Sequence, residues 1–518
     1  MLRAAALTLT CTALALGATA CGEAGSSGDG DPATLVPAGA SVYVEAAVQP
    51  TGDRREDALA AAGKLLRTED PAARLRELVD QGLDDDDLTW EKDFAPWIGE
   101  DAGLWATDLE QEEPTFAIVV ATKDMEAAQE ALTRFRATEG GSTTKRSHAG
   151  ADYEVDAEGQ ASGMVGDFLV AGSEAAFKRT AELDGDGESL AEADRYTAAI
   201  GELEEERLGH YYLDAARLLD AALAQDPAGA AQFEQFKSFL PLDKLGPVTG
   251  AFQADGDGMT LDTVLTGIPE GPFRELAALW SGGEPGLMAE LPGDAWAAYA
   301  VPKLGDAARR LFSSFAGPIG GAAIAAQVKQ STGLDLQEDI FAWVGDAGVF
   351  ARGTREADLG GALVIEATDD AKAATAFTKI VGLIGREAGL TPEPVRLDGA
   401  EAAFEVALPG EPQRLVLARG PGRVVAAYGQ QAATDALGAD AKLGDADAYE
   451  EAAGILGDDI VPAFLLSVPA ALALADAMGA SDADFEEARP YFEALGIVTS
   501  GGAAEDDQVR SRLAVTLK

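Results

Sequence analysis

The chain has 518 residues, of which 47% are hydrophobic, and its formal net charge is −50 at pH 7. A chain of this length and composition can build two or three domains with their own apolar cores. The strong negative charge argues against nucleic acid as a partner, because such binding depends on Lys and Arg side chains that neutralise phosphates. It also argues against direct docking on anionic lipid head groups. We interpret the charge as a solubility property of the surface rather than as a cation-binding function.

The N-terminus has the layout of a secretory signal peptide. Arg3 precedes an uncharged run, and small residues stand just before Cys21. This layout resembles a bacterial lipobox, whose cysteine is linked to diacylglycerol and becomes the first residue of the mature protein. The leucine usual three residues before the cysteine is replaced here by Ala18. We predict a signal peptide over residues 1–20 and lipid attachment at Cys21.

Two other interpretations of this segment stay open. A signal peptidase could cut near Ala20 and leave Cys21 unmodified. The run over residues 4–20 could also be kept as an anchor, but it is shorter than the roughly 20 apolar residues that span a bilayer. Residues 21–34, rich in Gly, Ser and Asp, are predicted to be a flexible tether. We therefore expect an extracytoplasmic protein, lipid-anchored to the cell membrane and without an internal disulfide.

The predicted elements of the first half mix strands and helices without a regular βαβ alternation. In chain order they are a strand over 41–48, helices over 55–67 and 72–81, strands over 103–107 and 115–121, a helix over 125–137, short strands over 153–156, 161–165 and 168–171, and a hairpin over 248–254 and 259–265. The second half shows the same order, with strands over 296–301, 348–352 and 362–366 and a helix over 371–383. This pattern predicts an α+β fold with mostly antiparallel sheets.

One sequence motif occurs in both halves. DFAPWIGEDAGLW at 93–105 matches DIFAWVGDAGVF at 339–350, which aligns Trp97 with Trp343, Gly99 with Gly345 and Gly103 with Gly348. Further matches follow in the same order, such as LAEADRYTAAIGEL at 190–203 with LGDADAYEEAAGIL at 443–456. We predict a tandem duplication. Its homologous halves would cover 35–280 and 288–518, joined by a linker over 281–287.

The two motif tryptophans, Trp97 and Trp343, could stack on a ligand or anchor the core. Their matching positions in both halves favour a shared requirement of the fold. We expect Gly99 and Gly345 to have a positive φ or to permit close approach of the backbone.

The sequence offers little for catalysis. Its two histidines, His148 in a polar loop and His210 in a strand-like segment, have no counterpart in the other half. Motifs of serine hydrolases, zinc proteases, P-loops and Rossmann folds are missing. The acidic run at 184–188 resembles the start of a calcium loop but lacks the glycine and glutamate that the pattern needs further on, and we interpret this run and the aspartates at 84–87 as solvated turns. We predict no catalytic residue, no metal and no cofactor.

The assembled pattern resembles a known family. It combines the lipoprotein signal with an opening strand, VPAGASVYVEA, and a strand-to-helix transition, TKDMEAAQEAL. It also contains the motif GLD…DFAPWIGEDAGL, which is repeated as GLDLQEDIFAWVGDAGVF. These features are similar to the actinobacterial domain-of-unknown-function family 3352, over about 35–518. The resemblance implies an exported or envelope-anchored protein, and it brings no established activity and no functional residue.

Three functions are compatible with the sequence. We favour a non-enzymatic lipoprotein on the outer face of the cytoplasmic membrane that binds an envelope protein or a small-molecule ligand, with a cleft between the halves as the expected site. The second is a carrier of lipid or another hydrophobic molecule, which requires an apolar cavity. The third is an extracellular hydrolase, which requires two buried carboxylates that converge in a cleft.

Overall fold

The computed structural model describes residues 30–518 apart from 84–87, 112, 140–141, 185–186, 227–228, 231–232, 234–244, 272–273, 275–285, 316–320, 388–389, 481 and 506. The predicted signal peptide, Cys21, most of the predicted tether and linker, and the aspartates at 84–87 lie outside the described residues. The described residues fall into two compact units, divided as 1–232 with 242–267 and 233–241 with 268–518. The predicted halves place their division further along the chain.

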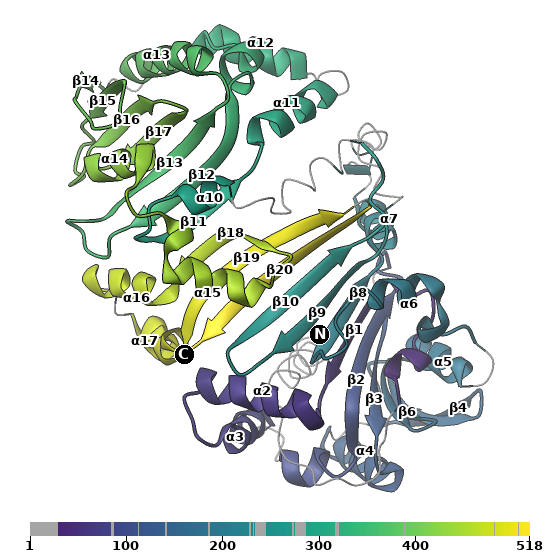
Figure 1. The fold of residues 1–518 in the computed structure, drawn as a ribbon. Helices are drawn as coiled ribbons and strands as arrows, with labels where there is room; N and C mark the ends of the chain where they lie inside the picture. Colours follow the sequence, from purple (N-terminus) through teal and green to yellow (C-terminus); the bar gives the residue numbers. More distant parts are fainter. Residues whose placement is uncertain are drawn as a thin grey trace. The chain divides into compact units, whose positions relative to one another are not determined.

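The first unit is built on an antiparallel sheet. Its strands are β1 (Val42–Ala47), β2 (Ile98–Thr107), β3 (Thr115–Thr122), β4 (Thr144–His148), β5 (Ala151–Val155), β6 (Gln160–Val165), β7 (Phe168–Ser173), β8 (Gly209–Leu213), β9 (Val248–Ala254) and β10 (Gly258–Leu265). They pair in the order β10-β9-β8-β1-β2-β3-β7-β6-β5-β4 (Figure 1). Its described helices are η1 (Pro32–Leu35), α2 (Gly52–Leu65), α3 (Pro71–Leu83), η3 (Trp90–Phe94), α4 (Met125–Glu139), α5 (Glu174–Leu183), η4 (Leu190–Glu192), α6 (Asp194–Ile200) and α7 (Ala215–Gln225).

The second unit is also built on an antiparallel sheet. Its strands are β11 (Ala295–Val301), β12 (Val344–Arg352), β13 (Gly360–Ala367), β14 (Glu393–Pro394), β15 (Ala402–Val406), β16 (Leu415–Gly420), β17 (Arg423–Tyr428), β18 (Val461–Ser467), β19 (Leu495–Glu505) and β20 (Gln508–Leu517). They pair in the order β20-β19-β18-β11-β12-β13-β17-β16-β15-β14. Its described helices are α10 (Gly286–Glu290), α11 (Leu304–Phe315), α12 (Gly321–Thr332), η6 (Leu336–Phe341), α13 (Asp370–Glu387), α14 (Gln430–Gly438), η7 (Leu443–Asp445), α15 (Asp447–Leu456), α16 (Val468–Ala477) and α17 (Ala483–Glu493).

The two sheets have the same topology, strand for strand. Smaller details repeat as well: the amide of Leu190 donates to the carbonyl of Val36 at 2.7 Å, and the amide of Leu443 donates to the carbonyl of Leu291 at 2.7 Å. The predicted α+β fold and its tandem duplication are therefore confirmed, with a mostly antiparallel sheet and packed helices in each half.

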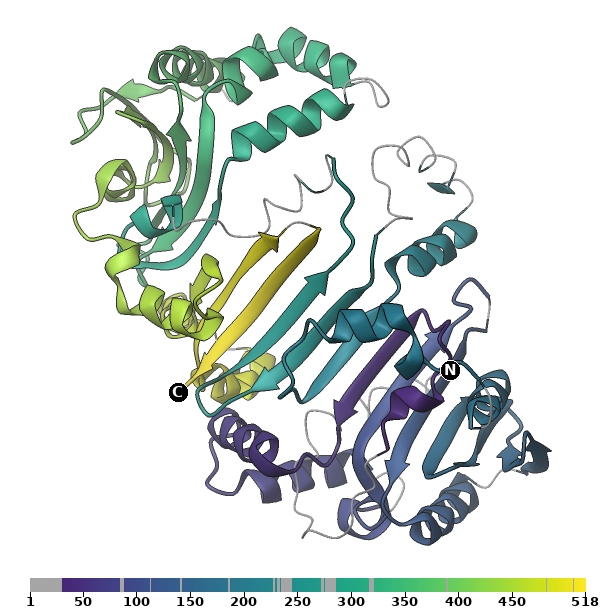
Figure 2. The same ribbon diagram turned by 45° about the vertical axis from the view of Figure 1, so that its right-hand side comes forward.

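One face of each sheet is closed by helices, and we call it the covered face. In the first unit, η1, α5 and α6 pack on β-strand residues such as Tyr43, Trp105 and Val119 (Figure 2). In the second unit, α10, α14 and α15 pack on the corresponding strands through residues such as Phe350 and Val364. The largest apolar clusters of both units lie on this face, because helices seal it along its centre.

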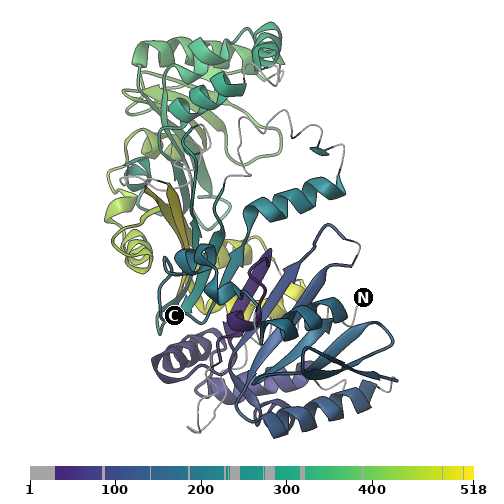
Figure 3. The same cartoon turned by 90° about the vertical axis from the view of Figure 1, so that its right-hand side faces the viewer.

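The opposite face is closed over only part of its area, and we call it the half-open face. In the first unit α4 and η3 cover it through a cluster that includes Trp97 and Leu132. In the second unit α11, α13 and η6 do so, through clusters around Trp343 and Phe377 (Figure 3). On the central strands of this face, Val44 and Val349 are 39% and 43% exposed.

Three local features differ from the sequence-based expectations. His148 lies in β4 rather than in a loop. The strand is polar and largely exposed, as suits a sheet edge protected from further pairing, so no apolar alternation announces it. Pro32–Leu35, inside the predicted tether, forms a 3₁₀-helix whose Ala33 and Leu35 are buried. Gly286 and Leu287, inside the predicted linker, begin α10, and Leu287 is buried.

Candidate functional site

The repeated tryptophan motif forms the same local structure in both units. A short π-helix, η3 or η6, precedes the tryptophan, which then leads into β2 or β12. Trp97 Nε1 donates to the carbonyl oxygen of Asp93 at 2.7 Å, and Trp343 Nε1 donates to that of Asp339 at 2.7 Å. Both indoles are buried, with exposed fractions of 4% and 1%. They lie within apolar clusters under the covering helices, as expected for core anchors.

The motif glycines permit close approach of the backbone, and none of them has a positive φ. A Cβ on Gly99 would lie 2.9 Å from the carbonyl oxygen of Ala121. A Cβ on Gly345 would lie 3.1 Å from Thr368 Cγ2. On the covered face, Gly103 leaves room for the ring of Tyr43, and Gly348 leaves room for Leu287. These four positions shape the sheets and contain no reactive group.

Sequence reasoning missed the aspartate four residues before each tryptophan. Asp93 Oδ2 accepts the amide of Thr89 at 3.0 Å, and Asp339 Oδ2 accepts the amide of Asp335 at 2.9 Å. Each is also paired with a cation on the covering helix. Arg134 of α4 lies 3.5 Å from Asp93, and Lys379 of α13 lies 2.6 Å from Asp339. Both units keep the whole arrangement, so we infer that the fold requires it. In the sequence, the aspartate of DF and DI recurs at the same place in both copies of the motif, and this repetition could have identified it.

A buried polar network lies on the covered face of the first unit. Tyr43 donates its hydroxyl to Glu45 Oε2, two residues along β1. Glu45 Oε1 lies 3.7 Å from Nδ1 of His210, which stands opposite it on β8. The other ring nitrogen of His210 lies 2.7 Å from the hydroxyl of Tyr196 on α6. Tyr43, Glu45, His210 and Tyr196 thus form one chain of polar groups, which we call the Glu45 network.

Burial changes the proton affinities within the Glu45 network. It raises the pKa of Glu45 to about 7, and the carboxylates of Asp31 and Asp101 add to this rise, while the Tyr43 hydrogen bond and Arg207 oppose it. Burial also lowers the pKa of His210 to about 3, with a further contribution from Arg207. At neutral pH the histidine is therefore uncharged and the carboxyl group is partly protonated.

The second unit has no equivalent of the Glu45 network at the corresponding positions. Gly348 stands opposite Ala300 in the second sheet as Gly103 stands opposite Glu45 in the first, so Ala300 replaces the carboxyl group. By the same register Ala298 replaces Tyr43. Tyr449, which corresponds to Tyr196, has a buried hydroxyl without a hydrogen-bond partner among the described residues. The fold can therefore form without this network, which is a special property of the first unit.

An uncovered row of apolar side chains crosses the half-open face of each sheet, and we call it the apolar row. In the second unit Tyr299, Val349 and Leu363 are neighbours on β11, β12 and β13, with exposed fractions of 39%, 43% and 41%. The first unit places Val44, Leu104 and Ile118 at the same register positions on β1, β2 and β3, where Val44 is 39% exposed. Leu104 and Ile118 are partly buried, so the row is more open in the second unit than in the first.

Acidic side chains stand in the turn that joins two strands of the apolar row in the first unit. Strands β2 and β3, which carry Leu104 and Ile118, are joined by the segment 108–114. Glu110 and Glu113 are exposed in this segment. The exposed acidic groups therefore lie at the end of these two strands.

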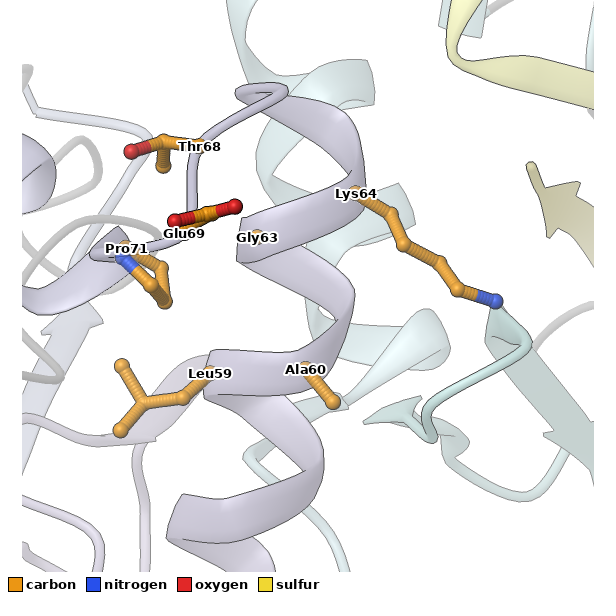
Figure 4. Close-up of a pocket in the computed structure, with 7 residues that line it drawn as sticks. All are labelled: Leu59, Ala60, Gly63, Lys64, Thr68, Glu69 and Pro71. Atoms are coloured by element: carbon orange, nitrogen blue, oxygen red, sulfur yellow. The ribbon is translucent and has the colours of Figure 1, made fainter.

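A shallow hollow of about 500 Å³ lies between α2 and the turn that leads into α3 (Figure 4). Its lining residues are Leu59, Ala60, Gly63, Lys64, Thr68, Glu69 and Pro71. Lys64 points away from the turn, and its ammonium group lies 3.1 Å from the carboxylate of Asp257. The hollow brings together no pair of groups suited to catalysis, and its volume is set by the packing of two helices.

Both histidines contact other side chains of the fold. His148 is paired with Glu182 at 2.7 Å on the surface, and His210 belongs to the Glu45 network. Within the described part of the chain, no group of three or more His, Cys, Asp or Glu side chains is arranged to hold a metal ion. The described helices include none that is long and apolar enough to cross a bilayer.

Comparison with known proteins places the chain in a family. The model of the family described as "Protein of unknown function (DUF3352)" matches residues 2–402. The chain belongs to this family. The family description names no activity. No protein with a curated description matches the chain.

Three solved structures are distantly similar to the chain, and all are crystal forms of TP0453. Crystal form IV is 13% identical with a TM-score of 0.26, and covers 46% of this chain and 80% of that one. Crystal form III is 13% identical with a TM-score of 0.25, and covers 49% of this chain and 88% of that one. Crystal form I is 12% identical with a TM-score of 0.26, and covers 49% of this chain and 87% of that one. TM-scores of this size do not establish a shared fold.

Proposed function

We propose that this protein is a non-enzymatic lipoprotein, anchored through Cys21 at the outer face of the cytoplasmic membrane, that binds a protein partner on the half-open faces of its sheets. The observation that carries the binding proposal is the apolar row: both units place apolar side chains at the same three register positions, and four of these six side chains are 39–43% exposed. Exposed apolar surface lowers the solubility of a secreted protein, so its repetition in both units is best explained by a shared use.

The chemistry of the surface suggests the kind of partner. The most open side chains of the apolar row are 39–43% exposed. Such a surface offers side-chain contacts to a partner that packs on it. The exposed Glu110 and Glu113 in the turn between β2 and β3, on a chain with a net charge of −50, favour a partner whose apolar side chains are flanked by Lys or Arg. We therefore propose an envelope protein with a basic and apolar contact surface.

The other functions receive less support. A hydrolase would need two carboxylates that converge in a cleft, whereas the Glu45 carboxyl group accepts the Tyr43 hydroxyl and lies 3.7 Å from His210. A lipid carrier would need an apolar cavity, whereas the hollow near α2 is shallow and partly lined by polar groups. Co-purification of a lipid beyond the anchor would favour the carrier.

The anchor is tested by mass spectrometry of the native protein extracted from membranes. We expect a mature N-terminus at Cys21 that carries diacylglycerol, and no such species in a Cys21→Ser variant. An unmodified cysteine or an uncut N-terminus would contradict the proposed localisation. The same extracts show whether a lipid or metabolite co-purifies.

The partner is tested by photo-crosslinking in whole cells. A photoreactive residue replaces Val44 or Val349, one in each apolar row, and a third probe replaces Met478, which is 71% exposed away from the rows. We expect one and the same envelope protein from both row positions and not from Met478. The crosslink should weaken with added salt and with Leu363→Glu, but not with the matched variant Met478→Glu. A crosslink yield that salt and Leu363→Glu leave unchanged, or no crosslinked protein from either row position, would contradict the proposal.

A further inference from the structure

The Glu45 network lies directly beneath residues 31–35, which include η1. A Cβ placed on Gly103 would come within 2.8 Å of the Tyr43 ring and 3.0 Å of Pro32 Cβ, so Pro32 and Tyr43 close over the same glycine. Gly103 is also the residue opposite Glu45 in the β1–β2 pairing. The segment is therefore docked at the place where the network is buried.

The segment is short, and its attachment is mostly apolar. Ala33 and Leu35 are 0% and 4% exposed and belong to the apolar cluster of the covered face. Within the segment, Asp31 Oδ1 accepts the amide of Ala33 at 2.8 Å, and the amide of Thr34 donates to the carbonyl of Asp31 at 3.1 Å. These hydrogen bonds fix the carboxylate of Asp31 at the N-terminal end of η1.

The charges around Glu45 are unbalanced. Asp31 precedes η1 and Asp101 lies on β2, and both carboxylates act against a charge on Glu45. Arg207, just before β8, is the cation that acts in its favour. From β8 and α6 the groups that face it are His210, which is uncharged at neutral pH, and Tyr196 behind it.

We propose that the Glu45 network is a proton-operated latch: with a proton on Glu45, residues 31–35 stay docked on the first sheet, and loss of that proton releases them. An ionised Glu45 would be a third carboxylate beside Asp31 and Asp101 in a desolvated place. Release of the segment removes Asp31 from this group and admits water to the carboxylate. The rest of the covered face keeps its helices α5 and α6.

The second unit shows what the segment looks like without a latch. There α10 takes the place of η1, and Leu287 and Met288 are 2% and 3% exposed. Ala300 stands where Glu45 stands in the first unit, so this segment packs on an apolar surface. The attachment of α10 is therefore expected to be independent of pH over the range in which the latch opens.

If the protein is lipid-anchored as proposed above, the latch also affects the tether between the anchor and the folded body. If Cys21 carries the lipid, docking of residues 31–35 sets where the tether meets the folded body. Opening the latch would lengthen the tether by these residues. The latch itself is a property of the first unit and can be tested without lipid or partner.

The experiment is hydrogen–deuterium exchange of the full chain, measured by mass spectrometry from pH 5 to pH 8.5 and corrected for the intrinsic exchange rate. The reporters are the amides of Thr34 and Val36, which are hydrogen-bonded within the segment. We expect their protection in the wild type to fall about tenfold between pH 6 and pH 8. The amide of Leu291, bonded to Met288 in the second unit, is the internal control and should stay unchanged.

Two variants separate the latch from general instability. Glu45→Gln keeps an acceptor for Tyr43 but has no proton to lose, so its protection should not change with pH. Tyr43→Phe removes the hydrogen bond that lowers the pKa of Glu45, so opening should move to higher pH. Constant protection in the wild type, the same fall in Glu45→Gln, or an unchanged or lowered opening range in Tyr43→Phe would overturn the proposal.

Discussion

Trp97 donates its indole N–H to the backbone carbonyl of Asp93 at 2.7 Å, and this bond closes the π-helical turn that leads into β2. The wider helical turn leaves carbonyl groups without their usual partners, and the indole satisfies one of them inside the core. The same bond between Trp343 and Asp339 shows that the turn, and not a ligand, requires the tryptophan.

The contribution of this hydrogen bond to stability can be measured by comparing Trp→Phe variants at two buried positions. Trp97→Phe should lower the free energy of unfolding by about 1–3 kcal/mol more than Trp105→Phe. Trp105 is also fully buried, but its indole nitrogen has no hydrogen-bond partner among the described residues, so only volume is lost there. Urea denaturation followed by circular dichroism gives both values. Equal losses would show that the bond to Asp93 adds nothing.

The close approach at Gly99 predicts a steric cost. Gly99→Ala should lower the stability by about 1–3 kcal/mol, because the new methyl group would lie 2.9 Å from a backbone oxygen that a side-chain shift does not relieve. Gly82→Ala is the matched control. Gly82 lies in α3, and no atom of the described residues lies within 4 Å of the added Cβ, so this change should be neutral or stabilise the helix by up to about 1 kcal/mol. Thermal unfolding of both variants is the measurement.

The raised pKa of Glu45 predicts how stability depends on pH. Between its ordinary pKa of 4.5 and about 7, the folded state holds a proton that the unfolded state releases, so rising pH destabilises the fold. The contribution is absent below pH 4.5 and complete above pH 7, where it amounts to about 3 kcal/mol. Relative to the wild type, Glu45→Gln should therefore gain stability from pH 4 to pH 8. A constant difference between the two proteins over this range would contradict the shift.

The register of the half-open face predicts opposite outcomes at adjacent positions. Leu363→Ala should cost less than about 1 kcal/mol, since Leu363 is 41% exposed. Val364→Ala should cost about 2 kcal/mol or more, because Val364 is 0% exposed in the core of the covered face. Chemical denaturation of the two variants decides between this register and one shifted by a residue, which would reverse the order.

The sequence was sufficient for the architecture because its signals are repeated. The match of Trp97 with Trp343 predicted the duplication, and the positions of the two indoles explain why the residues recur. Most of the strands and longer helices of the first half could also be placed from their apolar spacing. The edge strand β4 could not, because its residues are nearly all exposed and give no pattern.

Strand β1 shows why the candidate sites could not be predicted. Its alternation of Val42, Val44 and Ala46 with Tyr43 and Glu45 alone would place the valines in the core. The structure does the reverse: Tyr43 is 0% exposed on the covered face, whereas Val44 is 39% exposed on the other. This inversion produces both the Glu45 network and part of the apolar row. It depends on which face the helices cover, which is decided by segments far apart in the chain.

The hydroxyl of Tyr449, which has no hydrogen-bond partner among the described residues, bears on how the two units diverged. A buried hydroxyl without a partner weakens a core, so stability alone would favour phenylalanine at this position. Tyr196, its counterpart, uses the same hydroxyl to bind His210. A tyrosine at both positions is the outcome expected if the ancestral single copy already contained the polar chain and the second copy later lost it. On this history, the polar chain is older than the duplication, and the C-terminal unit is the one that lost it.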